Sequence, residues 1–548
     1  MISRYFHTIR YLKIKQIYYR IWFHLIKPRI SGSPTPNIRV SKNEFCSPIK
    51  KKISLLNDNT FKFLNKSESL SEIGWSGNNN TITKLWRYNQ HYFDDLNAID
   101  SLNRKVWHDQ LLKLWVSENS IGKGVGWEPY PTSIRIVNWV KWHLLGNKLS
   151  DTAIQSLAFQ ADWLSKRIEW HILGNHLFSN AKALIFAGLF FSSKESEIWF
   201  KKGLKIINDE LKEQVLNDGG NFERSPMYHA IFLEDILDLI NISQTYSNVI
   251  QKPKIDEWIE TSINMFEWLD AMTHPDGDIA FFNDASLEIS PNLDELKKYA
   301  QRLRISYIST KFKKVTHLSD SGYIRFSSNN VIGLLDVAPI GPDYLPSHAH
   351  ADTLSFELSL FGQRLLVNSG TSEYEIGPIR QYERSTKAHN TVVVNDENSS
   401  EIWSGFRVAR RAYPFDLKIE ELENFVNISC SHDGYKRLAN SPIHRRHWQF
   451  SENSLVIKDL IDGSFKSACA YFYFHPSITI IKKKNNILRI EMLNGQKVIL
   501  QIKTGEPMIE TSYYTPEFGK KINTHCLKVA LDEKEGACVQ ILWDNLDE

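Results

Sequence analysis

The stretch RISYISTKFKKVTHLSDSGYIRFSSNNVIGLLDV, residues 304–337, marks a change in the hydrophobic period of the chain. From about residue 100 up to this stretch, apolar residues recur at helical spacing. From about residue 317 onward they alternate with polar residues, at the period of two that half-buried strands show. A block of helices followed by a block of strands is typical of an α+β chain rather than of a doubly wound sheet. The sequence therefore predicts a multidomain α+β protein with its junction in 304–320.

The segment DTAIQSLAFQADWLSKRI, 151–168, displays the helical period clearly. Its apolar side chains share one face: Ile154, Leu157, Ala161, Leu164 and Ile168. Similar segments begin near residues 133, 176, 195, 227, 256 and 293, with short loops between them. They predict a series of antiparallel helical hairpins. Beyond the junction, runs such as TLSFELSLFGQRLLV (353–367) and NTVVVND (390–396) predict the strands of an antiparallel sandwich.

Composition limits the possible functions. A chain of 548 residues with 42% apolar content is expected to form two or three domains. Its 66 basic and 63 acidic residues give a net charge of +3 without a basic stripe, which argues against a nucleic-acid partner. The five cysteines show no CxxC spacing, so neither a disulfide framework nor a thiolate zinc site is expected.

The first 40 residues form a basic, aromatic arm that begins MISRYFHTIRYLKIKQIYYRIWFHLIKPRI. The arm contains no apolar run long enough for a signal peptide or a membrane span. It fits either an amphipathic segment on an anionic membrane surface or a helix docked on the protein, and we favour the docked helix. The default compartment is then the cytoplasm, with peripheral membrane contact through the arm left open and the periplasm as the alternative.

Polar residues interrupt a strongly apolar helix in LGNHLFSNAKALIFAGLFF, 173–191. Asn175 stands where an N-cap belongs, before the apolar run. Asn175, Ser179 and Lys182 also fall at i, i+4 and i+7, which places them in one stripe. A polar stripe on an otherwise buried helix predicts a polar neighbour or ligand.

A second helix start lies in ERSPMYH, 223–229. Ser225 followed by Pro226 is an N-cap with proline at the first helical position, so Tyr228 and His229 fall in the first turn. The positive end of the helix macrodipole would ease loss of the phenolic proton of Tyr228, an effect of about 1 kcal/mol in exposed geometry.

In the strand half, PSHAHAD (346–352) places His348 and His350 on one side of an extended segment. His389 begins a later strand, and Asn368 ends the strand between them. Imidazoles that converge in this way suit a divalent metal or a combination of metal binding and acid–base work. Spacing alone leaves a metal site and a pair of solvated histidines about equally supported. The motifs GxxxxGK[ST], HExxH, GxSxG and GxGxxG do not occur.

The segments NHLFSNAKALIFAGLFF, ERSPMYH and SHAHADTLSFEL…RLLVNSGT…RSTKAHNTVVVN together resemble the heparinase II/III-like polysaccharide lyases. The resemblance extends by motif over about residues 80 to 400. It implies an incomplete (α/α) toroid followed by an antiparallel β-sandwich domain, with the active site in the cleft between them. The expected divisions are the arm at 1–40, the toroid at 41–313 and the sandwich at 314–548.

The resemblance also implies roles for individual residues. Asn175 would neutralise a substrate carboxylate, Tyr228 would be the general acid and a candidate base, and His348 would be the catalytic histidine. His350 and His389 would hold a structural divalent metal, usually zinc, with residue 368 as third ligand; the family commonly has aspartate there, where this chain has Asn368. Further substrate contacts are predicted for Arg135, His176, Glu223 and His229, although Arg135 also fits a structural ion pair.

The implied reaction is β-elimination from a polysaccharide that contains uronic acid. It removes the proton at C5, α to a carboxylate, and expels the sugar linked through O4, so it needs groups that stabilise the carboxylate, a base and an acid. Two alternatives remain. A hydrolase would need two carboxylates, for which Glu223 and Asp284 in the turn THPDGDIAFFNDA (273–285) are the candidates. A non-cleaving factor in surface-polysaccharide biosynthesis would suit the basic arm.

Overall fold

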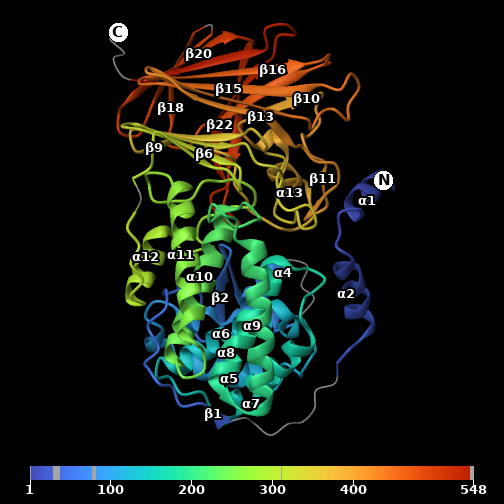
Figure 1. Cartoon of the computed structure of the whole chain (residues 1–548), viewed down its shortest axis with the longest axis vertical. Coiled ribbons are helices and arrows are strands. Elements are labelled where there is room, and N and C mark those ends of the chain that lie inside the picture. The colour runs from blue at the N-terminus through green and yellow to red at the C-terminus, as the bar shows by residue number, and fades with distance from the viewer. Residues whose placement is uncertain (1, 29–36, 77–81, 310, 485, 544–548) are drawn as a thin grey trace.

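The computed structural model describes residues 2–28, 37–76, 82–309, 311–484 and 486–543. Helices fill one half of the molecule and sheets the other, as Figure 1 shows. The helical half ends with α12 (Leu293–Arg302), and the strand half begins with β5 (Val315–Leu318). The segregated helices and strands predicted from the two periods are confirmed.

The helical half is an array of helices packed around one apolar core. Its helices are α3 (Leu70–Ile73), α4 (Lys84–Tyr92), α5 (Lys105–Glu118), α6 (Pro129–Leu144), α7 (Asp151–Lys166), α8 (Gly174–Phe190), α9 (Lys194–Gln214), α10 (Pro226–Thr245), α11 (Lys252–Ala271) and α12. Short strands accompany them: β1 (Asn37–Ile38), β2 (Thr60–Phe63), β3 (Lys66–Ser69) and β4 (Phe191–Ser192).

Helix α8 lies at the centre of this array. All of its residues except Asn175 and His176 are buried, because it packs against α6, α9 and α10. A Cβ added at Gly188 would lie 2.7 Å from the backbone nitrogen of Phe200, so glycine permits the close approach of α8 and α9. The apolar helix α8 is therefore a central, buried helix with two partly exposed polar residues in its first turn.

The strand half contains three larger sheets, and every pairing between its named strands is antiparallel. The five-stranded sheet has β5, β6 (Tyr323–Ser328), β7 (Val331–Asp336), β8 (Phe356–Leu360) and β9 (Gln363–Leu366) in sequence order. The eight-stranded sheet has the order β13-β14-β15-β16-β23-β20-β19-β18, and the four-stranded sheet has the order β10-β17-β22-β21.

The bounds of the remaining elements are β10 (Val392–Val394), β11 (Ile402–Trp403), β12 (Arg407–Val408), β13 (Pro414–Glu421), β14 (Phe425–His432), β15 (Ile443–Ser451), β16 (Ser454–Asp462), β17 (Ala468–Tyr473), β18 (Thr479–Lys484), β19 (Ile487–Glu491), β20 (Lys497–Thr504), β21 (Glu506–Tyr514), β22 (Ile522–Ala530), β23 (Ala537–Leu542) and the short helix α13 (Pro378–Glu383).

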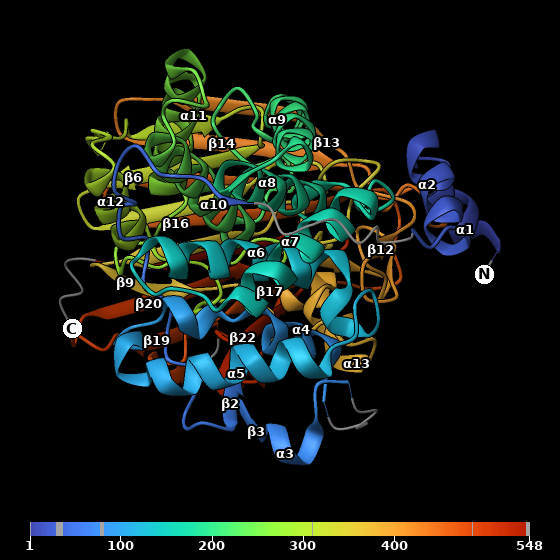
Figure 2. The same ribbon diagram turned by 90° about the horizontal axis from the view of Figure 1, so that it is seen from below.

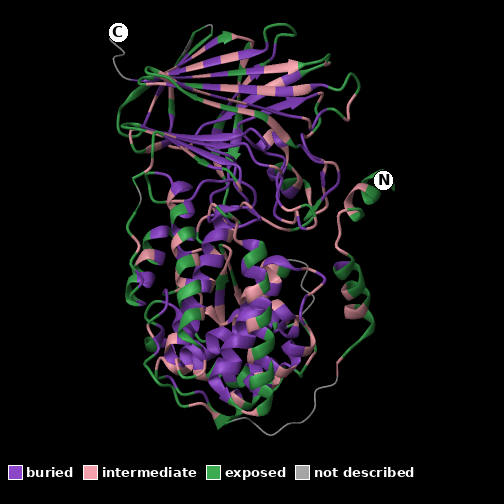
Figure 3. Cartoon of the chain, viewed as in Figure 1, coloured by how far each residue is buried: buried purple, intermediate pink, exposed green. Residues whose placement is uncertain are grey.

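Stacked aromatic rings join the five-stranded and eight-stranded sheets face to face. The ring centroids of Phe326 in β6 and Phe450 in β15 are 4.1 Å apart, with planes 14° from parallel. Both side chains are fully buried in one apolar core, and the buried faces are coloured purple in Figure 3. The alternating burial along β15 is what a strand with one inward face should show. The predicted antiparallel sandwich is confirmed.

The N-terminal arm is two helices, α1 (Ile2–Ile9) and α2 (Ile14–Leu25), that lie on one side of the molecule in Figures 1 and 2. The ring of Tyr5 packs against Trp403 of the strand half, and the ring of Phe23 packs against His171 of the helical half. The arm is thus docked on both halves, as favoured from its sequence. Among the described residues no helix is long and apolar enough to cross a membrane.

Candidate active site

Tyr228 and His348 face each other where the helical half meets the strand half. Their ring centroids are 3.8 Å apart, with planes inclined by 33°. Tyr228 is in the first turn of α10, where the Ser225 hydroxyl accepts a hydrogen bond from the Tyr228 backbone N–H at 3.2 Å. The N-cap and N1 proline predicted from ERSPMYH are therefore confirmed. His348 lies in the loop that leads to β8.

The carboxylate of Asp284 organises the loop that holds His348. Nδ1 of His348 donates a hydrogen bond to the Asp284 carboxylate at 2.9 Å, and Nε2 of His350 donates to the same carboxylate at 2.8 Å. Arg380, from α13, donates to both carboxylate oxygens, with Nη2 at 2.7 Å. Asp284 and Arg380 have no exposed surface, so the pair is out of contact with water.

These contacts keep Asp284 ionised. Burial alone would raise the pKa of this carboxyl group, but the charge of Arg380 and the hydrogen bonds from the two histidines hold its pKa well below its usual range. A carboxylate at Nδ1 in turn fixes His348 with its proton on Nδ1, which leaves the lone pair on Nε2. Nε2 is therefore the atom of His348 that is available to a reacting group.

Glu223 lies on the free side of His348, with Oε2 at 3.6 Å from Nε2. The side chain is buried, and Oε2 has no hydrogen-bond partner within the described part of the chain. Burial raises the pKa of Glu223, although His348 and the backbone N–H of Asn175 act in the opposite direction. A neutral carboxylic acid in this position can donate a hydrogen bond as well as accept one.

Asn175 and His176 are the half-buried pair at the first turn of α8. The prediction that Asn175 caps this helix is wrong: the N-cap is Leu173, at φ 69°, and the helix begins at Gly174. A Cβ at Gly174 would lie 2.4 Å from Leu345 and 3.0 Å from Oε1 of Glu223, so this close approach requires glycine. Nδ1 of His176 lies 3.2 Å from Oε2 of Glu169, close to the group around Glu223.

The other polar residues of the predicted α8 stripe meet side chains of the protein. Lys182 Nζ lies 2.6 Å from Oδ1 of Asp235 and 2.5 Å from Oδ2 of Asp238, both on α10. These ion pairs connect two core helices. The polar neighbours that the stripe predicted are therefore acidic residues of α10, at least for Lys182.

The phenol of Tyr228 is hydrogen-bonded to a second phenol, with 3.0 Å between its Oη and that of Tyr374. Burial is the main cause that raises the pKa of Tyr228 well above its usual value, and Tyr374 and Asp284 add to it. This corrects the expectation that the helix macrodipole eases loss of the proton, because removal from water outweighs a macrodipole effect of about 1 kcal/mol. Tyr228 is therefore a neutral phenol that keeps its proton.

The structure does not bring Arg135 and His229 to this group. The Arg135 guanidinium donates to Gln160 at 2.9 Å and lies 3.9 Å from the centre of the Trp115 ring, with no exposed surface. His229 is also fully buried, and its Nδ1 accepts from the backbone N–H of Asn221 at 3.1 Å while Nε2 donates to the Met265 carbonyl at 2.9 Å. Both predicted substrate contacts are therefore corrected to structural roles in the helical core.

Two of the three predicted metal ligands, His350 and His389, lie together. Nδ1 of His350 and Nε2 of His389 are 3.1 Å apart. The other ring nitrogens, which point away from each other, both donate hydrogen bonds. Nε2 of His350 donates to Asp284 and Nδ1 of His389 donates to the Ser385 carbonyl, each at 2.8 Å. Burial lowers the pKa of His350 to about 4 and also lowers that of His389, so two neutral rings direct lone pairs at each other. Such a pair, with its outer nitrogens held, fits two ligands of a divalent cation.

Asn368 does not complete this donor set in the way an aspartate would. Its amide nitrogen donates to the Phe281 carbonyl at 2.9 Å, and its amide oxygen accepts from the Asn390 backbone N–H at 3.1 Å. No group of three or more His, Cys, Asp or Glu side chains among the described residues could hold a metal ion. A cation between the two imidazoles would depend on water or on the weaker amide oxygen for further ligands.

Several residues of the group were not predicted. The sequence indicates Asp284 as a turn residue that could line a cleft and as one carboxylate of a hydrolase pair, and it gives no signal for Tyr374 or Arg380. The ring of Tyr374 lies under the Arg380 guanidinium, 4.8 Å from centroid to Cζ. Neither residue belongs to a motif, because each enters the site from a loop or short helix whose position depends on the tertiary fold.

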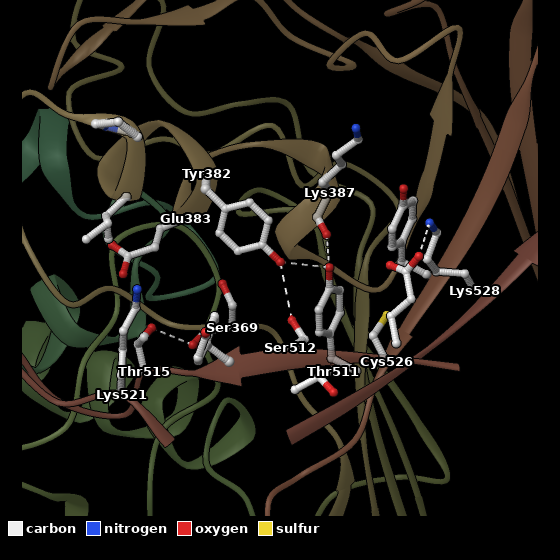
Figure 4. Close-up of a pocket in the computed structure, with 16 residues that line it drawn as sticks. Ser369, Tyr382, Glu383, Lys387, Thr511, Ser512, Thr515, Lys521, Cys526 and Lys528 are labelled. Atoms are coloured by element: carbon white, nitrogen blue, oxygen red, sulfur yellow. Dashed lines mark hydrogen bonds and ion pairs between the residues drawn. The ribbon is translucent and has the colours of Figure 1, made fainter. Parts of the chain in front are cut away.

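A separate cavity of about 470 Å³ opens beside α13 in the strand half. Figure 4 shows residues of its lining, among them Tyr382, Lys387, Ser512, Lys521 and Lys528. Tyr382 and Tyr473 are 3.1 Å apart at their hydroxyl groups. None of the residues predicted for catalysis or metal binding lines this cavity, so it is distinct from the group around His348.

Comparison with known families gives two matches that together cover most of the chain. The model described as "Heparinase II/III N-terminus" matches residues 83–306, and the model described as "Heparinase II/III-like, C-terminal" matches residues 310–542.

Two characterised relatives are similar over parts of their length. A heparin-sulfate lyase of Bacteroides stercoris is 28% identical over 330 residues, which are 57% of this chain and 47% of that protein. A heparin-sulfate lyase of Pedobacter heparinus is 26% identical over 260 residues, 44% of this chain and 38% of that protein. The matched stretches span less than half the length of each relative.

Solved structures share the fold over nearly the whole chain. A crystal structure of heparinase III superimposes with a TM-score of 0.71 at 17% identity and covers 96% of this chain and 89% of that one. A heparan sulfate lyase from Pedobacter heparinus gives a TM-score of 0.58 at 18% identity, with 96% and 87% covered. The expected fold class, a helical toroid followed by an antiparallel β-sandwich, is confirmed.

Proposed function

Since the chain belongs to the heparinase II/III-like family, we propose that it is a polysaccharide lyase that cleaves an acidic, uronic-acid-containing polysaccharide by β-elimination. The observation that carries the proposal is the stacking of the neutral phenol of Tyr228 on the His348 ring, whose Nδ1 is held by Asp284. This places a proton donor and a proton acceptor side by side, as elimination requires.

The carboxylate of the bound sugar is the first group that the site must neutralise. The C5 proton becomes removable only when the charge that develops on the carboxylate is stabilised by nearby donors. Glu223 is buried and its pKa is raised, so its neutral form can donate a hydrogen bond to that carboxylate. Asn175, on the half-buried first turn of α8, hydrogen-bonds Glu223 through its backbone N–H, and its side-chain amide is the second proposed donor to the substrate carboxylate.

In the proposed reaction, Nε2 of His348 takes the proton from C5, and the electron pair of the C5–H bond forms the C4–C5 double bond. The C4–O4 bond breaks with its electron pair on O4. Tyr228 gives its phenolic proton to that oxygen, and the leaving chain departs as an alcohol. Tyr374, hydrogen-bonded to Tyr228 at 3.0 Å, orients the phenol. The product carries a 4,5-unsaturated sugar, and no oxidant or reductant is consumed.

A divalent metal, most consistent with zinc, is proposed to be held by His350 and His389, where it would supply positive charge that fixes the two segments carrying these residues. None of the proton transfers involves these two residues. His350 itself keeps Asp284 in place through Nε2. The metal is therefore proposed as structural.

The hydrolase alternative is less well supported by the geometry. A hydrolase needs one carboxylate free to activate water or attack the sugar. Asp284 is fully buried and occupied by Arg380 and two histidines, so it is not open to either role. Of the nominated pair, only Glu223 has a carboxylate oxygen without a hydrogen-bond partner among the described residues.

The proposal is tested by incubating the protein with a set of uronate polymers and following ultraviolet absorbance. A lyase creates an absorbing double bond with every cut. New reducing ends without absorbance would indicate hydrolysis, and binding with neither signal would indicate a non-cleaving factor.

A further inference from the structure

The N-terminal arm carries an apolar face that points away from the protein. In α2 the side chains at Ile14, Ile21 and Leu25 are 85%, 57% and 74% exposed, and their spacing of seven and four residues places them in one line. In α1, Ile2 and Phe6 repeat the arrangement at 87% and 63% exposure. Large apolar side chains exposed in such a line are unusual on a surface that meets only water.

The opposite face of the arm is fixed to the protein. In α2, the Arg167 guanidinium lies 3.4 Å from the centre of the Phe23 ring and donates to the Phe23 carbonyl at 2.8 Å. In α1, the Thr8 hydroxyl accepts from Nε1 of Trp403 at 3.1 Å. Lys13, between the helices, forms an ion pair with Glu213. The exposed line is therefore held outward by contacts to both halves of the molecule, and much of the arm is coloured green, as exposed, in Figure 3.

The charge of the arm is of one sign. The first 43 residues of the chain, which include the arm, contain nine lysines and arginines and no aspartate or glutamate, whereas the rest of the chain has 57 basic and 63 acidic residues. On α2, Arg20 is exposed and lies about 100° around the helix from Ile21, and exposed Lys27 follows the helix end. Basic side chains beside an apolar line are the pattern of a helix that lies in the plane of an anionic bilayer surface.

We propose that the arm is a membrane-docking element, and that its occupant is the surface of an anionic phospholipid bilayer. The apolar line would enter the boundary between headgroups and acyl chains, while Arg20 and Lys27 contact the lipid phosphates. A protein partner would need an acidic groove of matching length. A bilayer needs only the two features that the arm presents, apolar area and positive charge.

The arm also contacts the loop that holds His348. The Lys13 ammonium lies 3.7 Å from the centre of the Tyr344 ring, and the Gln16 amide donates to the Tyr344 carbonyl at 3.3 Å. Tyr344 is four residues before His348 in the loop that holds this histidine. A docked arm thus places the loop that holds His348 close to the bilayer. A polysaccharide attached to the membrane would then be within reach, an inference that rests on the proposed function.

The test is co-sedimentation of the full-length protein with lipid vesicles. One set contains phosphatidylcholine alone, and the other contains about 30% phosphatidylglycerol, which gives the vesicle surface a strong negative charge. The wild type is expected to bind the anionic vesicles, and to bind them about tenfold more weakly at high salt. The variant Ile14→Ser/Ile21→Ser/Leu25→Ser should lose about tenfold or more in partitioning, because the apolar area is removed. Arg20→Glu/Lys27→Glu should also lose about tenfold.

The matched control is Leu102→Ser/Val106→Ser/Leu493→Ser, which removes three exposed apolar side chains from other surfaces. It should bind as the wild type does. Failure of the wild type to bind anionic vesicles would overturn the proposal, as would equal losses in the arm variant and the control. Sedimentation velocity distinguishes self-association from membrane binding. If the wild type is a dimer, the arm variant is a monomer and neither binds vesicles, the apolar face contacts a second copy of the chain and the proposal is overturned. Lyase activity is not used as a readout, so failure of this proposal and failure of the proposed function are distinguishable.

Discussion

Replacing Asp284 by asparagine should separate the electrostatic role of this carboxylate from its shape. The amide has nearly the same volume, but it carries no charge and presents an N–H₂ group on one side. Arg380, which has no exposed surface, would lose its counter-charge. Removing one partner of such a buried pair costs about 3–5 kcal/mol of unfolding free energy. His348 would at the same time lose the acceptor that keeps its proton on Nδ1.

The expected loss of activity in Asp284→Asn is about 10²–10⁴-fold in kcat, the range for a positioned acid or base that is no longer set up correctly. Thermal unfolding followed by circular dichroism measures the stability, and ultraviolet absorbance on a uronate polymer measures turnover. Turnover must be compared at a temperature where both proteins are folded.

Asp276→Asn is the matched control, because Asp276 also pairs with a buried arginine, Arg364, through Oδ2 and Nε at 2.6 Å. Its side chain is 37% exposed, and it lies outside the catalytic group. This variant should lose stability. Its kcat should stay within about twofold of the wild-type value, because the substitution changes no contact to the transition state. A folded Asp284→Asn protein with nearly full kcat would refute the idea that Asp284 sets the state of His348.

Three further outcomes are expected. Glu223→Gln should keep kcat within about tenfold while Glu223→Ala loses about 10²-fold, because a neutral donor is what the substrate carboxylate needs; the reverse order in a uronate assay would show that the ionised form works. Zinc should raise the Tm of the wild type but not of His350→Ala/His389→Ala, and elemental analysis without bound metal after zinc addition would leave only a histidine pair. Asp459, buried beside Arg446, has its pKa lowered to about 2 against the opposing effect of burial. Its ionised form should therefore contribute about 2 kcal/mol to the free energy of unfolding above about pH 4, and this contribution is lost as the pH falls toward 2. Asp459→Asn should flatten this part of the curve of unfolding free energy against pH.

The overall architecture could be predicted because it follows from local periods. The α7 segment places four apolar residues on one face whatever surrounds it, although the fifth predicted position, Ile168, lies beyond the helix end. In β14, FVNISCSH, apolar and polar residues alternate in the same local way. The start of α10 at Ser225 and Pro226 was predictable for the same reason, since a cap and an N1 proline act within one turn.

Positions that depend on tertiary contacts were beyond such reasoning. The start of α8 is displaced from Asn175 to Leu173 because the chain at Gly174 must pass close to Leu345 and Glu223, which are remote in sequence. Periodicity places Arg135 on a helix face but does not reveal that this face is turned to the core rather than to a cleft.

The residues that complete the site show the same limit. Asp284 reads as part of a turn, and Arg380 lies in a six-residue helix without a recognisable pattern. Their pairing joins positions 96 residues apart. The histidines were visible in the sequence because two of them occur within three residues. The carboxylate that orients them was not, because its role exists only once the two halves of the molecule have come together.

The most direct test of the central claim is the initial rate of ultraviolet absorbance from a uronate polymer with wild-type protein and with Tyr228→Phe. The substitution keeps the ring that stacks on His348 and the Ser225 cap, and removes only the hydroxyl that would protonate the leaving oxygen. We predict unsaturated product from the wild type and a loss of about 10²-fold or more in the variant, with unfolding temperatures that agree closely. A folded Tyr228→Phe protein that produces unsaturated sugar at nearly the wild-type rate would contradict the account.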